Sequence, residues 1–468
     1  MLFNSYVFLF VFLPILLAVY YGVLRTIRAR NAWLTLMSYI FYGWWNPLFC
    51  LLMMASTASD YVIGKHLYRA KTESRRKLLM TLTVIVNLSV LGFFKYYNFF
   101  AVSLNSLFTW LHLPVYAPIL ADLVLPIGIS FYTFESLSYT IDIYRREVKP
   151  ANNIIDFFCF ISLFPHLIAG PIMRYVDLDR QLKDREHSEG KFAVGIIFFV
   201  TGLLKKLVIA DNVAPMADAV FNAKTGTTVL DAWLGSLAYT MQIYFDFSAY
   251  SDMAVGLGLM IGFEIIQNFN SPYQSTSVQD FWRRWHISLS SWLRDYLYVP
   301  LGGNRKGKYR TYVNLILVML LGGLWHGAGW TFVLWGLYHG VLQAIERALG
   351  ARHPLKQLPV WGQRLATFLL VLVGWVFFRA TDFTIALRIL GNMVGYTGNQ
   401  PITPLQLARP VGLLFLAFAT VVSMTYPNLW TQPVRLNFRT AVVYGVGLVG
   451  SIILIMTRQN SPFLYFQF

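Results

Sequence analysis

The sequence predicts an all-α protein with many membrane-spanning helices, and three observations carry that prediction. Hydrophobic residues make up 56% of the 468 residues and charged residues 13%, and the mean hydropathy of +0.53 lies outside the usual soluble range. The apolar residues gather in runs of about 17 to 22, long enough to cross a hydrocarbon core of about 30 Å. The basic residues stand in short clusters between these runs, which is typical of cytoplasmic loops.

Because some apolar runs hold two spans, we expect about 10 to 12 membrane crossings, with re-entrant segments between them. No internal repeat and no Gly/Ser-rich linker divides the chain, so we expect a single transmembrane domain over residues 1–468. The apolar runs lie at 5–24, 31–46, 48–64, 78–99, 123–143, 192–210, 231–266, 311–346, 364–380, 410–426 and 440–457.

The net charge of +16 does not indicate a nucleic-acid partner, because the basic clusters follow the membrane pattern and therefore face lipid headgroups and the cytoplasm. Cys50 and Cys159 both stand in apolar surroundings, and two cysteines so placed predict no disulfide framework and no metal site. The N-terminus lacks a basic segment and a small-residue cleavage site, so we expect the first apolar run to be retained as a span.

The basic clusters also predict an orientation. Clusters at 25–30 and 65–77 mark two cytoplasmic loops. The apolar stretch between them must therefore cross the membrane to the outer side and cross back to the cytoplasm. Its turn is Trp44–Pro47, where paired indoles suit an interface and proline ends a helix. We therefore expect the N-terminus on the outer side.

Residues 152–173 are apolar, yet basic residues flank them on both sides. A re-entrant element resolves this conflict. Its deepest part carries Pro165, Gly170 and Pro171, and such broken backbone is tolerated only inside protein or around a cavity. His166 lies among them, either as a functional group or as an interfacial histidine held by a backbone carbonyl.

Two carboxylates, Asp246 and Asp252, stand at the start of the apolar run 253–262. They are six residues apart and do not share a helical face, so a paired acid/base site is poorly supported. Asp246 could orient an imidazole or a substrate amide. The alternative is a helix start capped by Ser251 or Asp252.

The stretch 268–310 is basic, with tryptophans interleaved. Such a face could hold the phosphates of a nucleotide-bearing donor, and it could equally lie at lipid headgroups. Candidates for donor binding are Arg283, Arg284, Trp285 and Arg294.

Two histidines are the strongest candidates for chemistry, because imidazoles in or beside a membrane are costly unless they have a function. His326 lies in an apolar run among Gly322, Gly323, Gly327 and Gly329, and small residues allow close approach of a backbone or substrate. A neutral imidazole there can act as a general base. A structural or heme-ligating histidine is the alternative, although the 13-residue distance to His339 does not favour two heme ligands on one helix.

Four blocks of sequence together carry a resemblance: 281–298, 321–328, 164–171 and 244–252. They resemble the signature blocks of the membrane-bound O-acyltransferase (MBOAT) family, and the likeness runs from the N-terminal apolar segment through at least Arg379.

This resemblance implies a multi-helix bundle around a central funnel, with catalytic blocks at about 120–350. It implies His326 as catalytic base and His286 as a second family histidine near the cytoplasmic mouth. It also implies an acetyl group taken from a cytoplasmic donor, acetyl-CoA, with no bound cofactor. The acceptor would be an extracytoplasmic polysaccharide such as alginate, reached through an extracytoplasmic acetyltransferase partner, and the protein would lie in the bacterial inner membrane.

The chain ends in an aromatic tail, residues 463–468. This tail resembles the C-terminal segment of the small membrane partner in teichoic-acid D-alanylation systems. We hypothesise that Tyr465 enters the funnel from the outer side and carries the acyl group transiently after His326 removes its proton. The alternative is an interfacial aromatic anchor.

Two further classes compete with an enzyme. A transporter or flippase would also contain re-entrant elements, but would usually show inverted repeats and midplane charges. A scaffold for polysaccharide export would need neither His326 nor its glycines.

Overall fold

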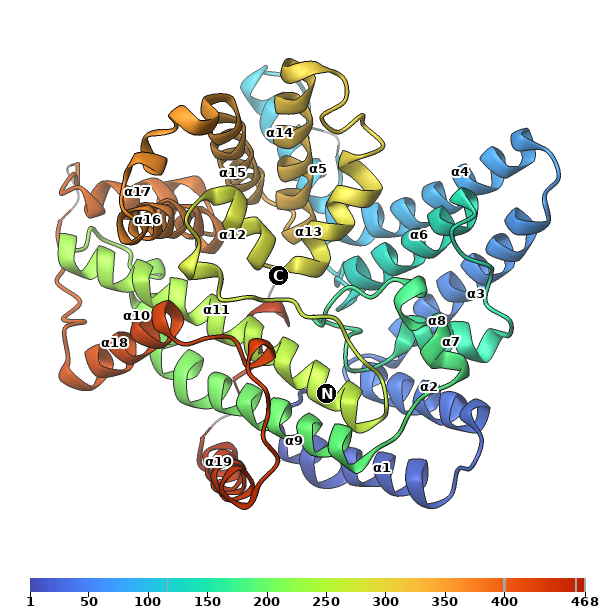
Figure 1. The fold of residues 1–468 in the computed structure, drawn as a ribbon. Helices are drawn as coiled ribbons and strands as arrows, with labels where there is room; N and C mark the ends of the chain where they lie inside the picture. Colours follow the sequence, from blue (N-terminus) through green and yellow to red (C-terminus); the bar gives the residue numbers. More distant parts are fainter. Residues whose placement is uncertain (116, 399–400, 459–460, 467–468) are drawn as a thin grey trace. The chain divides into compact units, whose positions relative to one another are not determined.

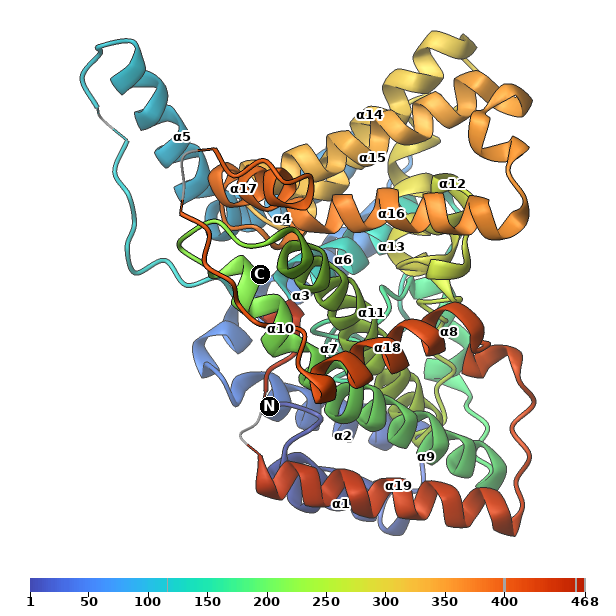
Figure 2. The same ribbon diagram turned by 90° about the vertical axis from the view of Figure 1, so that its left-hand side faces the viewer.

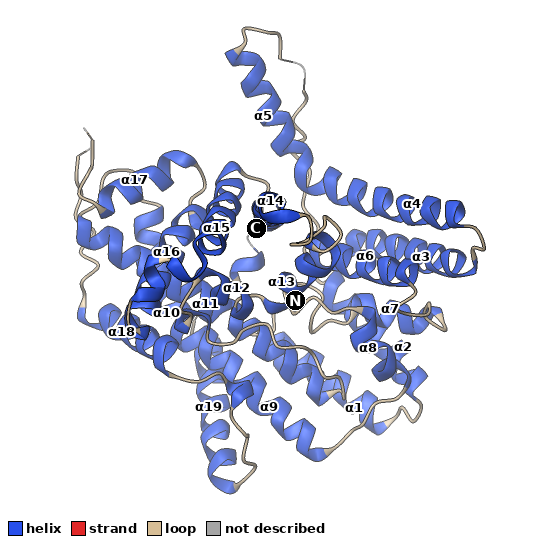
Figure 3. Cartoon of the chain, turned by 45° about the horizontal axis from the view of Figure 1, so that its top comes forward, coloured by secondary structure: helices blue, strands red, loops and turns tan. Residues whose placement is uncertain are grey.

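The computed structural model describes residues 1–115, 117–398, 401–458 and 461–466. Helices and short helical turns form nearly all of its regular structure (Figure 3). Within those ranges there is no strand, and a single isolated bridge joins Gly226 and Ile402. The prediction of an all-α fold is confirmed.

The chain forms two compact units. The first unit contains residues 1–195 and 257–265, and the second contains 196–256 and 266–468. The boundary passes through two helices, α9 (Glu189–Leu204) and α11 (Val229–Met260). The expectation of one domain over the whole chain stays a prediction.

The first unit is a set of helices whose ends follow the local sequence (Figure 1). As the turn signal predicts, one helix ends at Gly43 and the next begins at Pro47, where the Asn46 side chain accepts from the Leu48 N–H. The helices and π-helical turns are η1 (Phe8–Phe12), α1 (Leu13–Gly22), α2 (Ile27–Gly43), α3 (Pro47–Arg69), α4 (Glu73–Leu91), η2 (Gly92–Tyr96), α5 (Tyr97–Trp110), α6 (Ile129–Arg145), α7 (Ile154–Ser162) and α8 (Tyr175–Lys183).

The segment expected to be re-entrant consists of the short helix α7 followed by non-helical backbone over 163–173, all of it buried. His166 Nδ1 lies 2.9 Å from Glu135 Oε1, and both side chains are fully buried. The same carboxylate oxygen accepts a hydrogen bond from the Met173 N–H. The partner of His166 is therefore a carboxylate, and the alternative of a backbone carbonyl is wrong.

The second unit contains the blocks with the candidate histidines. Its helices after α9 are η3 (Lys205–Ala210), α10 (Asp211–Phe221), α11, η4 (Pro272–Gln274), α12 (Val278–Arg284), α13 (Ile287–Leu293), η5 (Arg294–Tyr298), α14 (Gly307–His326), α15 (Trp330–Leu349), η6 (Gly350–Arg352), η7 (Pro354–Gln357), α16 (Val360–Arg379), α17 (Phe383–Met393), α18 (Pro410–Thr425), η8 (Leu429–Thr431), α19 (Phe438–Thr457) and η9 (Leu464–Phe466).

Helices α14 and α15 form a closely packed hairpin (Figures 1 and 2). Glycines make this approach possible: a Cβ on Gly323 would lie 2.2 Å from the Phe332 carbonyl oxygen, and one on Gly336 would lie 2.3 Å from the Met319 carbonyl oxygen. The glycine-rich setting of His326 thus allows two helix backbones to approach, as small residues do in membrane helix pairs.

Six helical stretches of the described chain are both long and apolar enough to cross a membrane, so the protein is a multi-pass membrane protein. They are Pro47–Arg69, Glu73–Trp110, Glu189–Phe221, Val360–Arg379, Pro410–Thr431 and Phe438–Thr457. The expected total of about 10 to 12 crossings and the orientation of the N-terminus remain predictions.

Candidate active site

Three predicted site residues meet inside the second unit, although they lie far apart in the sequence. The hydroxyl of Tyr465 lies 3.4 Å from His326 Nδ1. The ring of His286 is centred 6.1 Å from that of His326 and 6.4 Å from that of Tyr465. Two imidazoles and a phenol therefore share one site.

His326 is the last residue of α14, and Gly327 follows it with extended backbone, at φ of −157°. A Cβ on Gly327 would lie 2.1 Å from the Phe332 ring, so a larger residue does not fit there. Trp335 and Phe378 contact the imidazole with ring centroids 5.2 Å away. The aromatic surroundings leave His326 only 6% exposed, which excludes most of the water that would compete for its nitrogens.

His286 lies at the junction of α12 and α13, in a left-handed conformation with φ of 45°. That conformation is strained for a non-glycine residue, and such strain often marks functional positions. Its Nδ1 is 3.2 Å from Asn268 Oδ1, which also accepts from the Ser288 N–H and hydroxyl. An acceptor at this distance assigns the proton to Nδ1 and leaves Nε2 with a lone pair.

His286 and His326 differ in their surroundings and therefore in their ability to accept a proton. His286 is fully buried, and burial lowers its pKa to about 3, so it stays neutral near pH 7 and is a poor proton acceptor. Burial raises the pKa of Tyr465 well above its usual range. Loss of the phenolic proton near neutral pH would require a base in contact with the hydroxyl, and the imidazole within contact distance is that of His326.

Asp246 and Asp252 lie in the middle of α11, which continues from Val229 to Met260. The alternative of a helix start capped by Ser251 or Asp252 is therefore wrong. Each carboxylate pairs with a lysine: Asp252 Oδ2 with Lys205 Nζ at 2.6 Å, and Asp246 Oδ1 with Lys206 Nζ at 2.7 Å.

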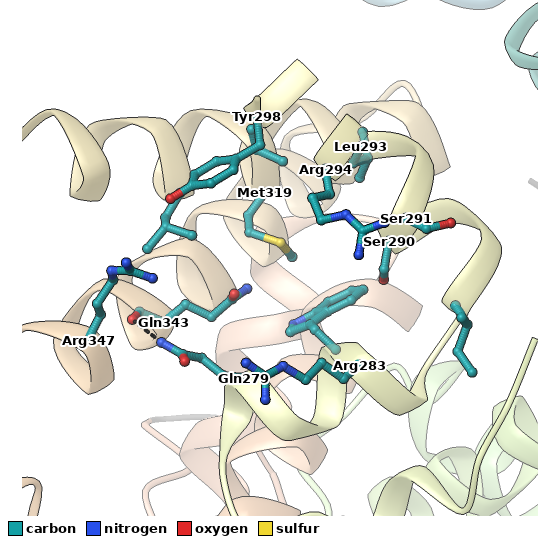
Figure 4. Close-up of a pocket in the computed structure, with 14 residues that line it drawn as sticks. Gln279, Arg283, Ser290, Ser291, Leu293, Arg294, Tyr298, Met319, Gln343 and Arg347 are labelled. Carbon is teal, nitrogen blue, oxygen red and sulfur yellow. Dashed lines mark hydrogen bonds between the residues drawn. The ribbon is translucent and has the colours of Figure 1, made fainter. Parts of the chain in front are cut away.

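A cavity of about 420 Å³ lies beside this site, between α12, α13, η5, α14 and α15. Arg283, Arg294 and Arg347 reach into it from different sides (Figure 4). Arg294 also pairs with the neighbouring Asp295, at 2.6 Å from Nε to Oδ1. The lining of the cavity thus carries three guanidinium groups.

Two other predicted donor-binding residues do not line this cavity. Arg284 pairs with Asp280 one helical turn earlier, at 3.0 Å. Trp285 is fully buried and packs against Trp375 with ring centroids 4.8 Å apart. The structure therefore brings Arg283 and Arg294 together in the cavity and places Arg284 and Trp285 elsewhere.

Aromatic rings connect the cavity wall with the histidines. Trp282 lines the cavity, and its ring is centred 5.5 Å from that of Trp335, which in turn contacts His326. The indole N–H of Trp282 donates to His339 Nδ1 at 3.3 Å. His339 thus supports the cavity wall.

Three residues of the site were not predicted from the sequence: Asn268, which binds His286, Arg347, which lines the cavity, and Lys206, which pairs with Asp246. Asn268 has only its proximity to the 281–298 block as a signal, and Arg347 follows a long apolar run like any interfacial arginine. Lys206 could have been noticed as a charge inside the apolar run 192–210.

An imidazole in contact with a phenol, beside a cavity lined by arginines, is an arrangement that can activate a hydroxyl for acyl transfer. Sequence comparison agrees, because the family model for "MBOAT, membrane-bound O-acyltransferase family" matches residues 147–384. The chain belongs to this family and is an O-acyltransferase.

Individual relatives extend the comparison. The chain is 47% identical to "Probable alginate O-acetylase AlgI" of Pseudomonas putida, over 100% of both chains. It is 38% identical to "Peptidoglycan O-acetyltransferase" of Helicobacter pylori, over 85% of this chain and 80% of the relative. It is 31% identical to "Teichoic acid D-alanyltransferase" of Bacillus subtilis, over 47% of this chain and 58% of the relative.

Proposed function

We propose that this O-acyltransferase takes an acetyl group from cytoplasmic acetyl-CoA and passes it through Tyr465 towards an extracytoplasmic polysaccharide. His326 is the general base of this proposal. The observation that carries it is the 3.4 Å contact between the Tyr465 hydroxyl and His326 Nδ1, because a phenol beside a base is an activated nucleophile.

The cationic cavity supports acetyl-CoA as the donor. The phosphates of acetyl-CoA suit guanidinium groups, which bind phosphate oxygens in a bidentate manner. Arg283, Arg294 and Arg347 supply three guanidinium groups to the cavity. The cavity wall also approaches the histidines through Trp282 and Trp335. A donor whose phosphates lie among the arginines would extend its thioester towards His326.

The chemical step conserves atoms and charge. His326 accepts the phenolic proton while the Tyr465 oxygen attacks the thioester carbonyl carbon. The carbon–sulfur bond then breaks, the CoA sulfur takes up the proton, and acetyl-Tyr465 remains. An acceptor hydroxyl, first on an extracytoplasmic acetyltransferase partner and then on the polymer, takes the acetyl group and restores the phenol.

The acceptor class is drawn from the relatives. Their names place their activities on alginate, peptidoglycan and teichoic acid, all of them glycan-containing or polyol polymers outside the cytoplasm. With 47% identity over both full chains, an alginate-like polysaccharide is our proposed acceptor. We place the protein in the bacterial inner membrane, with residues 1–468 acting as one transmembrane domain.

The test is intact-mass measurement of the purified protein after incubation with acetyl-CoA and no acceptor. We expect wild type to gain the mass of one acetyl group, mapped to the C-terminal peptide. Tyr465→Phe and His326→Ala should lose the adduct. Tyr426→Phe is the matched control, because Tyr426 is exposed and follows α18, and it should keep the adduct.

An unmodified C-terminal peptide in wild type would contradict the tyrosine route. If acceptor transfer then still depended on His326, the acetyl group would pass directly from donor to acceptor. Retention of the adduct in His326→Ala would instead remove His326 from the role of base.

A further inference from the structure

A buried ion pair in the second unit holds the end of the chain. Lys206 on η3 and Asp246 on α11 are each 2% exposed, and their charged atoms lie 2.7 Å apart. Taking two charges out of water is costly unless further hydrogen bonds satisfy them. Lys206 also pairs with Asp211 at 2.9 Å, and the other partners of the Lys206–Asp246 pair come from the C-terminal segment.

Both charges bind main-chain groups of that segment. Asp246 Oδ2 accepts a hydrogen bond from the Leu464 N–H at 2.8 Å. Lys206 Nζ donates to the Pro462 carbonyl oxygen at 3.1 Å and to the Ser461 hydroxyl at 3.3 Å. The carboxylate thus binds the Leu464 N–H, and the ammonium binds the Pro462 carbonyl oxygen two residues earlier. These two bonds together fix the direction and register of the segment.

Aromatic contacts hold the side chains on either side of these main-chain bonds. Phe463 is 1% exposed, lies under the Lys206 ammonium at 4.9 Å, and meets Tyr250 edge-on at 5.2 Å. Tyr465 packs on Phe247 with ring centroids 4.1 Å apart. Tyr465 follows Leu464 directly, so the Asp246 bond lies one residue from the phenol that contacts His326.

A second lysine–aspartate pair on the same elements provides a comparison. Lys205 and Asp252 lie 2.6 Å apart and, in the described part of the chain, hydrogen-bond to each other and not to the C-terminal segment. The two pairs share their residue types and their elements. They differ in contact with the segment and in Asp211, which Lys206 also binds at 2.9 Å.

We propose that the Lys206–Asp246 pair is a binding site for the C-terminal segment, and that it positions Tyr465 at His326. The segment is recognised through the backbone of Pro462 and Leu464 and through Phe463. This inference rests on the proposed function for its catalytic consequence. The binding itself does not depend on acyl transfer.

The test uses full-length protein in which both charges are removed together, Lys206→Met with Asp246→Leu. Replacing a whole buried pair by apolar residues is often neutral for folding, whereas removing one partner leaves an uncompensated charge. Asp211, the second carboxylate that Lys206 binds, is 17% exposed and keeps contact with water in this variant. The matched control is Lys205→Met with Asp252→Leu. Lys206→Arg is the conservative variant, because it keeps the charge and the donors.

The first measurement is hydrogen–deuterium exchange at the Leu464 amide. A hydrogen bond to a charged group corresponds to about tenfold or more in an equilibrium, so we expect exchange to accelerate by at least that factor in the Lys206/Asp246 double variant. The Lys205/Asp252 double variant should exchange like wild type. Unchanged exchange in the Lys206/Asp246 variant would overturn the proposed binding site.

The second measurement is the rate of acetyl-Tyr465 formation against acetyl-CoA concentration. We expect the Lys206/Asp246 variant to lose maximal rate with unchanged half-saturation by donor, the control to keep both, and Lys206→Arg to recover part of the rate. A maximal rate equal to wild type would overturn the positioning role. If wild type forms no acetyl-Tyr465, the proposed function fails, and the exchange measurement still decides whether the pair binds the segment.

Discussion

Two buried histidines, one in each unit, have different partners, and the partner distinguishes a structural role from a chemical one. His166 in the first unit pairs with Glu135, whose carboxylate also binds the Met173 N–H. His326 in the second unit contacts the hydroxyl of Tyr465. Both stand among glycines or prolines in apolar sequence. A carboxylate that also binds backbone holds a segment in place, whereas a phenol beside an imidazole can become a nucleophile.

The largest expected effect is on catalysis at His326. His326→Ala should lower the rate of acetyl transfer by about 10²–10⁴-fold, the usual contribution of a general base. Thermal unfolding in detergent should stay close to wild type. The check is the initial rate of CoA release, and a rate within a few-fold of wild type would assign His326 to packing.

His166→Ala should have the opposite profile. It leaves the buried Glu135 carboxyl without the imidazole that contacts it, and a buried polar group that loses its partner costs about 1–3 kcal/mol of stability. The measurement is the free energy of unfolding, with turnover per folded molecule as the companion value. A variant with wild-type stability but lost turnover would show that His166 takes part in the reaction, as proposed for His326.

Smaller effects should follow from the cavity. Arg283→Ala and Arg294→Ala should each raise the half-saturating concentration of acetyl-CoA about tenfold, because each removes hydrogen bonds to charged phosphate. Arg284→Ala is the matched control, since its guanidinium pairs with Asp280. Donor titration of the acetyl adduct measures all three. An equal loss in the control would mean that general positive charge, not the cavity, attracts the donor.

The smallest effect concerns acid stability. The pKa of His286 is lowered to about 3 in the folded protein, against about 6.5 for an ordinary histidine. The unfolded state therefore binds more protons between these values, so this contribution to stability is present above about pH 6.5 and declines as the pH falls towards 3. His286→Gln should make the unfolding temperature less sensitive to a change from pH 7.5 to pH 5. An unchanged slope would show that His286 does not carry this dependence.

The local sequence predicted features that depend on near neighbours. The Trp44–Pro47 turn and the buried non-helical backbone after α7 are both present. His286 and His326 were noticed as imidazoles in or beside a membrane, and Tyr465 through the resemblance of the C-terminal tail. The three residues meet in one site.

Features that depend on distant partners were not predictable in this way. Asp246 resembled part of a helix start because polar residues cluster there, but Lys206 and Leu464, 40 and 218 residues away, satisfy its charge. Arg283 lines the cavity, whereas Arg284 pairs with Asp280 and Trp285 packs on Trp375, which is 90 residues away in the sequence.

Rapid-quench analysis of one turnover tests whether the acetyl group passes through Tyr465. Wild-type protein with its acceptor partner is mixed with isotope-labelled acetyl-CoA, and the label on the C-terminal peptide is followed with time. Acetyl-Tyr465 should rise before product and decay at least as fast as product forms, and Tyr465→Phe should yield neither. Product that forms at the wild-type rate in Tyr465→Phe, or before any label reaches the peptide, would contradict this route.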